Sequence, residues 1–165
     1  MTAALEGLYR IDSGASELEI LARAPGHDFT ARGRALRGTL RFKASTLVEL
    51  DVEALLAELK GADPIGTHEL RKFVDADRSP IVKATLLEPS TLTAAGLGYR
   101  GIARVRFMSP KKVLDASVEL SGSTERADGH LEASFSALGY APPKLLFLKV
   151  KDHLDVRIHV RLRPE

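Results

Sequence analysis

The last stretch of the chain, Asp152-His153-Leu154-Asp155-Val156-Arg157-Ile158-His159-Val160-Arg161-Leu162-Arg163, alternates polar and apolar residues without a break. Its apolar positions are the even-numbered ones, from Leu154 to Leu162, and charged residues or histidines fill the positions between them. Because successive side chains of a strand point to opposite faces, this period of two predicts one long strand with a dry face and a wet face. The rest of the chain must supply its partner strands.

The same two-residue alternation recurs along the chain, separated mostly by turn-type residues. It covers residues 8–11, 17–24, 36–43, 48–52, 81–87, 99–107, 114–120 and 131–137, with turns expected at 12–15, 25–28 and 122–129. We expect the first two segments to pair with each other. No segment is apolar on both faces, which disfavours a parallel sheet covered by helices. The pattern predicts an all-β sandwich or an antiparallel barrel, and the long strands favour the barrel.

One interruption of the strand pattern falls at about residues 53–76, where a helical period replaces the alternation. A short helix around Leu59 is expected to stop at Pro64, and Thr67 is expected to cap a second helical segment that runs through Val74. The sequence therefore predicts a short helical insert before the strands resume.

Composition places residues 1–165 in a single domain with room for a sizeable core. The 165 residues are 44% hydrophobic and 28% charged, with a net charge of +2. The absence of cysteine excludes disulfides, thiolate metal sites and a cysteine nucleophile. Aromatic residues make up only 5%, so no nucleic acid partner is expected. We see neither an export signal at the N-terminus nor an apolar run long enough for a transmembrane segment, and therefore expect a cytoplasmic protein.

The predicted inner face mixes very small residues, such as Gly101, Ala116 and Ala133, with large ones, such as Phe107 and Phe135. An eight-stranded barrel is just wide enough to be filled by side chains or to enclose one small ligand. The small residues thus leave two interpretations open: a barrel filled by neighbouring Leu and Phe side chains, or an apolar cavity for a long hydrocarbon.

Several short motifs in order along the chain resemble the YceI-like family, and in particular its Gly-His-Asp branch. They are Tyr9-Arg10-Ile11-Asp12, Gly26-His27-Asp28-Phe29, Phe73-Val74-Asp75-Ala76, Ile81-Val82-Lys83-Ala84 and Leu148-Lys149-Val150-Lys151-Asp152. The resemblance implies a lipocalin-like, eight-stranded antiparallel barrel that binds polyisoprenoid lipids and is non-catalytic. The chain departs from the family pattern at 103–113 and 136–140, so its ligand can differ from the family's.

A carrier of an isoprenoid-type or other long-chain amphiphile is therefore the predicted function, with no cofactor, metal or catalytic residue. The residues expected to contact the hydrocarbon are Leu40, Phe42, Val105, Phe107, Val118, Phe135, Val156 and Ile158. His27, Asp28 and Tyr140 are the candidates for polar contacts at the mouth, although a His-Asp pair more often fixes a loop. A homodimer is possible.

The alternative is a filled barrel that binds a protein or an anionic surface through its arginine faces. Arg100, Arg104 and Arg106 share one face of their strand, and Arg157, Arg161 and Arg163 share one face of the last strand. His153 and His159 also share a face, but about 20 Å of strand separates them, which is too far for one metal ion. Exposed charged positions must alternate with core positions in any barrel, so the arginines alone do not decide for this function.

Overall fold

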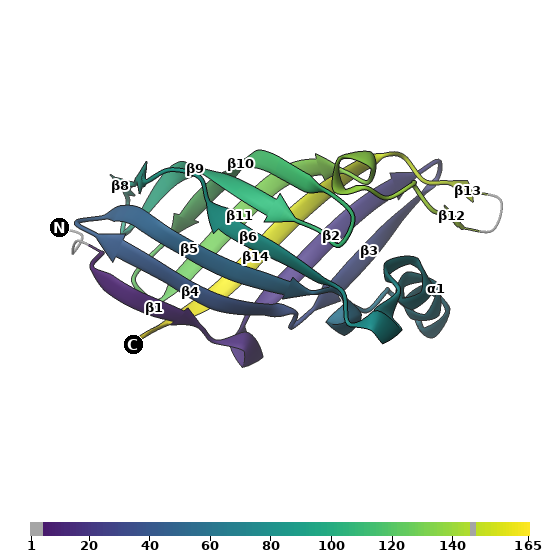
Figure 1. Ribbon diagram of the computed structural model, residues 1–165, viewed down its shortest axis with the longest axis horizontal. Helices are drawn as coiled ribbons and strands as arrows, with labels where there is room; N and C mark the ends of the chain where they lie inside the picture. The colour runs from purple at the N-terminus through teal and green to yellow at the C-terminus, as the bar shows by residue number, and fades with distance from the viewer. Residues whose placement is uncertain (1–4, 146–147) are drawn as a thin grey trace.

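A computed structural model describes residues 5–145 and 148–165 and is built mainly of β-strands (Figure 1). The strands are β1 (Gly7–Ile11), β2 (Glu17–Ala24), β3 (His27–Gly33), β4 (Leu36–Lys43), β5 (Thr46–Leu55), β6 (Ile81–Leu86), β7 (Ser90–Thr91), β8 (Thr93–Ala95), β9 (Gly98–Met108), β10 (Val113–Gly122), β11 (Arg126–Ser134), β12 (Lys144–Leu145), β13 (Leu148–Lys149) and β14 (His153–Pro164). The helical segments are α1 (Pro64–Val74) and the 3-10 turns η1 (Ser13–Ala15), η2 (Leu56–Glu58), η3 (Ala76–Arg78) and η4 (Ser136–Leu138). Leu146 and Phe147 lie outside the described residues.

Eight antiparallel strands close into a barrel, which confirms the predicted fold. Their order is β1-β4-β5-β6-β9-β10-β11-β14, and β14 pairs back onto β1. In β14 the buried residues are Leu154, Val160 and Leu162, with Val156 and Ile158 half-buried between them. The even-numbered residues of β14 therefore form the dry face that its alternation predicts.

The strand β14 is long enough to pair with two strands on the same side. Its C-terminal half pairs with β1, where Ile11 lies opposite Leu162, and its N-terminal half pairs with β2, where Ile20 lies opposite Val156. The expectation that β1 and β2 pair with each other is therefore wrong. Asp12 explains the break between them, because its side chain accepts from the Gly14 amide and its backbone bonds to β14, which turns the chain through η1.

A further strand, β3, extends the wall beyond β2 and was not predicted as a separate strand. Its alternation is weak because the positions that follow Phe29 on one face are only Ala31 and Gly33. Arg32 and Lys60 exchange two backbone hydrogen bonds of 2.9 and 2.8 Å, which join β3 to the segment after η2. A Cβ at Gly33 would lie 2.4 Å from the Glu58 carbonyl oxygen, so the close contact between β3 and η2 requires glycine at position 33.

The helical insert is confirmed, but its bounds differ from the prediction. Residues up to Leu55 remain in β5, and only the short turn η2 forms where the first helix was expected. Pro64 begins α1 instead of stopping a helix, because proline fits the first helical position. The N-cap is Asp63, which accepts a hydrogen bond from the Gly66 amide at 2.6 Å, in place of the predicted Thr67.

The turn predicted at 122–129 is much shorter, because β10 continues to Gly122 and β11 begins at Arg126. The prediction placed Gly129 in the turn. In the structure Gly129 lies within β11 opposite Leu120 and packs against Val118 and Ile158. At the other end of β11 the strand stops at Ser134, and the residues after Phe135 turn into η4.

Candidate ligand-binding interior

Both ends of the chain lie at the same end of the barrel (Figure 1). Side chains fill the interior there. The rings of Tyr9, Phe42 and Tyr99 are buried, with Tyr9 edge-on to Phe42 at 5.7 Å between centroids and Tyr99 tilted against Phe42 at 6.3 Å. The surrounding inner-face residues are also buried, including Leu47 and Ala103, which are both fully inaccessible. This part of the interior, which we call the floor, has no room for a ligand.

Toward the α1 end, inner-face residues keep part of their accessible surface. Their register places them opposite one another across neighbouring strands, as Ala84 lies opposite Phe107 and Ala116 opposite Val105. The half-buried inner positions include Val52, Ala84, Phe107, Ala116, Ala133 and Val156. Because apolar side chains of a well-packed core are normally sealed by their neighbours, this upper half of the barrel is less completely filled than the floor.

A second apolar cluster lies at the α1 end, which we call the mouth. Ala22, Ala24, Phe135, Val150 and Leu154 are its buried members. The strand β2, the loop before β14 and the start of β14 thus converge there, and they hold the mouth in a defined shape.

The helix is fastened to the mouth by aromatic contacts. The Phe73 ring lies edge-on to Phe135, with centroids 5.5 Å apart, and 5.4 Å from the Tyr140 ring. The ammonium group of Lys111 stands 4.8 Å from the centre of the Tyr140 ring. Burial, assisted by the charge of Asp75, raises the pKa of Tyr140 above its ordinary value. Tyr140 is therefore a neutral, half-buried hydroxyl-bearing side chain at neutral pH.

A hydrogen-bonded turn fixes the rim of the mouth beside η4. Asp152 accepts from the Ser136 amide at 2.9 Å and from the Ser136 hydroxyl, and this bonding lowers the pKa of its carboxyl. Ser109 Oγ donates to the Leu138 carbonyl at 2.7 Å, which ties the β9–β10 turn to η4. The Tyr140 amide donates to the Phe135 carbonyl at 2.8 Å, so the segment that carries Tyr140 is fixed by backbone and side-chain bonds.

Two solved structures share this architecture. A polyisoprenoid binding domain from Saccharophagus degradans implicated in plant cell wall breakdown superposes with a TM-score of 0.64 at 13% identity, over 95% of this chain and 98% of that one. BcnA of Burkholderia cenocepacia superposes with a TM-score of 0.74 at 14% identity, over 92% and 98%. No family model and no curated protein matches the sequence. The chain has the closed-barrel fold of these two proteins. The resemblance seen in its motifs is thereby confirmed at the level of the fold.

The barrel places all eight predicted hydrocarbon contacts on its apolar interior. Leu40, Phe42, Val105, Val118 and Phe135 are buried by neighbouring side chains, whereas Phe107, Val156 and Ile158 keep accessible surface. Phe42 and Leu40 belong to the floor. Direct contact with a ligand stays a prediction for all eight, and it is best supported for the three that remain partly accessible.

The polar residues predicted at the mouth do not gather at one point. His27 and Asp28 begin β3, directly after the β2–β3 turn, and Asp28 lies opposite Arg23 in the register. Asp28 is exposed, as is Arg23, so its carboxylate lies on the outer side of the hairpin. Tyr140, by contrast, packs into the aromatic cluster of the mouth. The roles predicted for the three residues stay predictions.

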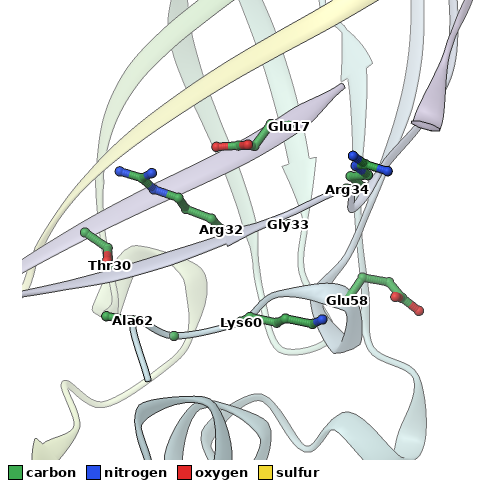
Figure 2. Close-up of a pocket in the computed structure, with 9 residues that line it drawn as sticks. Glu17, Thr30, Arg32, Gly33, Arg34, Glu58, Lys60 and Ala62 are labelled. Atoms are coloured by element: carbon green, nitrogen blue, oxygen red, sulfur yellow. The ribbon is translucent and has the colours of Figure 1, made fainter. Parts of the chain in front are cut away.

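An open groove of about 690 Å³ lies outside the barrel, along the seam between β3 and residues 58–62 (Figure 2). Charged and polar side chains line it, among them Arg32, Glu58, Lys60 and Thr30. A hydrocarbon chain would gain little from such a lining, because the favourable term for binding it is the burial of apolar surface. This groove is therefore distinct from the apolar interior.

Three of the six arginines on the arginine faces pair with an acidic residue. Arg106 contacts Asp115 at 2.8 Å, and Arg163 contacts Asp12 at 2.7 Å. Arg157 lies 3.9 Å from Asp155, and Arg104 donates to the Ser117 hydroxyl at 3.0 Å. Arg100, Arg104 and Arg161 have no acidic partner among the described residues. This pairing weakens the alternative of docking through the arginine faces.

Two features of the barrel were not predicted from the sequence. The contact of Phe73 with the mouth was missed because its motif predicts a helix-to-strand junction without showing what the ring touches. His130 Nε2 lies 2.6 Å from Asp155 across β11 and β14, and the alternation of both strands could have revealed this outer-face pair. Within the described residues, no three His, Asp or Glu side chains are grouped closely enough to hold a metal ion. No described helix is long and apolar enough to cross a membrane.

Proposed function

We propose that this protein is a non-catalytic carrier that holds the hydrocarbon part of a long-chain amphiphile of the isoprenoid type in the upper half of its barrel. The observation that carries the proposal is the contrast between the sealed floor and the partly accessible apolar side chains above it, such as Phe107 and Val156. The polyisoprenoid-binding neighbour supports the same class of ligand.

The energetic argument rests on hydrocarbon burial. Each methylene moved from water into an apolar site gains about 0.8 kcal/mol, so a chain of several isoprene units would bind without strong polar contacts. In the proposed complex the chain end reaches toward the floor and the polar head stays at the mouth. Tyr140 is the hydroxyl best placed to bond that head, because its ring is held by Phe73.

The experiment is a binding titration of delipidated protein with a medium-length polyprenol and an apolar fluorescent reporter. The Ala116→Phe variant adds a ring to the inner face of β10 and should weaken binding at least about 10-fold, equivalent to about 1.4 kcal/mol. The matched control is Val113→Phe on the outer side of the same strand, where the wild-type side chain is 55% exposed. Equal binding by wild type and Ala116→Phe would contradict an interior site.

A further inference from the structure

The two ends of the barrel differ in how their charges are balanced. At the mouth, six cationic side chains form no ion pair with any described residue. We call them the cationic rim, and they are Arg23, Lys72, Lys111, Lys112, Lys149 and Lys151. All six are exposed.

Several contacts show that members of the rim lie around the same end of the barrel. The Lys151 amide donates to the Arg23 carbonyl at 2.7 Å, which joins the loop before β14 to the end of β2. Lys111 lies over the Tyr140 ring, and that ring contacts Phe73, the neighbour of Lys72 on α1. The β2–β3 hairpin, α1 and the β12–β13 hairpin all project at this end (Figure 1).

Acidic residues at the mouth do not neutralise the rim. Asp152 is held by Ser136, Asp75 pairs with Arg78 at 3.2 Å, and Asp77 lies 4.0 Å from Arg71. Among the acids of this end, Asp28, Asp63, Glu69 and Asp152 have no cationic partner among the described residues. Six unmatched cations against these four acids leave the mouth positive.

The opposite end has fewer unmatched cations. There Arg10 pairs with Glu165, and Arg163 pairs with Asp12. Lys43, Arg100, Arg126 and Arg161 form no ion pair with a described residue. Two of them have an acid close by, because Glu6 accepts from the Ala44 amide beside Lys43 and Glu125 directly precedes Arg126. The larger group of unmatched cations therefore lies at the mouth.

We propose that the mouth docks on the surface of an anionic phospholipid bilayer through the cationic rim. Each lysine near such a surface contributes about 1 kcal/mol, so a few lysines acting together suffice for salt-sensitive binding. Docking in this orientation places the mouth against the bilayer. An apolar chain could then pass between the bilayer and the barrel without crossing water. Membrane docking goes beyond the carrier proposal, since it depends on the rim and not on what occupies the interior.

Exposed apolar surface at the same end fits this orientation. Ile65 is 77% exposed and shares a face of α1 with His68 and Lys72, three and seven residues further on. An isoleucine beside cationic side chains is the arrangement found where a helix face meets the boundary between headgroups and acyl chains.

Vesicle flotation tests the proposal with intact, delipidated protein. Wild type should float with vesicles of phosphatidylcholine and phosphatidylserine at low salt and should not float with phosphatidylcholine alone. The quadruple variant Lys111→Gln, Lys112→Gln, Lys149→Gln, Lys151→Gln should lose about 10-fold or more of its partition coefficient. The matched control removes four exposed charges from the other end, by Lys43→Gln, Arg100→Gln, Arg126→Gln and Arg161→Gln, and should bind within about two-fold of wild type.

Single tryptophans give a second readout that does not depend on the quadruple variant folding, because the chain has no tryptophan of its own. Fluorescence of Ile65→Trp should shift to the blue on anionic vesicles, and that of Leu97→Trp, 98% exposed on the β8–β9 turn, should not. Equal shifts at both sites, or an undiminished partition of the rim variant, would overturn the proposal. Rim-dependent binding to duplex DNA without vesicle binding would also overturn it and would assign the rim to nucleic acid.

Discussion

Phe73 on α1 and Phe135 at the end of β11 meet edge-on, with ring planes at 90° and centroids 5.5 Å apart. Sixty-two positions separate them in the numbering, so the contact fastens the helical insert to the opposite side of the mouth. Without it, α1 would be tied to the barrel mainly through Leu70, Val74 and the turns that flank the helix. The attachment of α1 to the mouth thus depends on the Phe73 ring, which contacts both Phe135 and Tyr140.

Replacing Phe73 by alanine should therefore loosen the helix and lower the stability of the whole domain. We expect a loss of about 2 kcal/mol in the free energy of unfolding, at the low end for phenylalanine because the ring is only half-buried. Urea unfolding measures the stability, and hydrogen exchange of the α1 amides measures the loosening. His68→Ala on the exposed face of the same helix is the control, and an equal effect of both changes would contradict this role of Phe73.

Substitutions at two alanines on neighbouring strands distinguish a filled barrel from a partly open one. Ala103 is fully buried at the floor, whereas Ala116, one register pair away on β10, keeps accessible surface. Leucine at 103 should cost about 1–3 kcal/mol by overpacking, and leucine at 116 should cost under about 1 kcal/mol. Equal destabilisation of both variants in urea unfolding would mean that the upper half is packed as tightly as the floor.

Tyr99 should lower the stability of the folded protein at high pH. Its hydroxyl is buried with no hydrogen-bond partner among the described residues, and burial raises its pKa to about 12 from 10.0. Since the unfolded chain releases this proton first, stability should fall as the pH rises from 10.0 toward about 12. Tyr99→Phe should remove that fall and leave the neutral-pH stability unchanged or raised by up to about 1 kcal/mol. A larger loss at neutral pH would show that the hydroxyl has a partner.

Asp152 should contribute stability that disappears in acid. Hydrogen bonds from Ser136 lower its pKa below 3.8, so the ionised carboxyl favours the folded state above that pH, and the contribution is lost as the pH falls through the lowered value. Asp152→Asn should be less stable than wild type at neutral pH, and the difference should shrink below pH 3.8. Asp77→Asn, whose side chain is fully exposed, is the control. A difference that is independent of pH would contradict the assignment.

The sequence was sufficient to predict the barrel and the dry face of β14, because strict alternation determines which side chains share a face. It could not give the pairing of β1 with β14, since the alternation of β1 is compatible with any neighbour. The sequence also could not show that the floor is sealed and the upper half is less completely filled. Ala103 and Ala116 have the same side chain and differ only in what surrounds them. The cationic rim was missed because Arg23, Lys111 and Lys151 come together only through folding.

The most direct measurement is to purify the full chain from cells under native conditions, extract it with organic solvent and analyse the extract by mass spectrometry. The carrier account predicts about one long-chain, isoprenoid-type amphiphile per chain, depleted in Ala116→Phe and retained in Val113→Phe. An extract without lipid, from a protein that also takes up no polyprenol after delipidation, would contradict it.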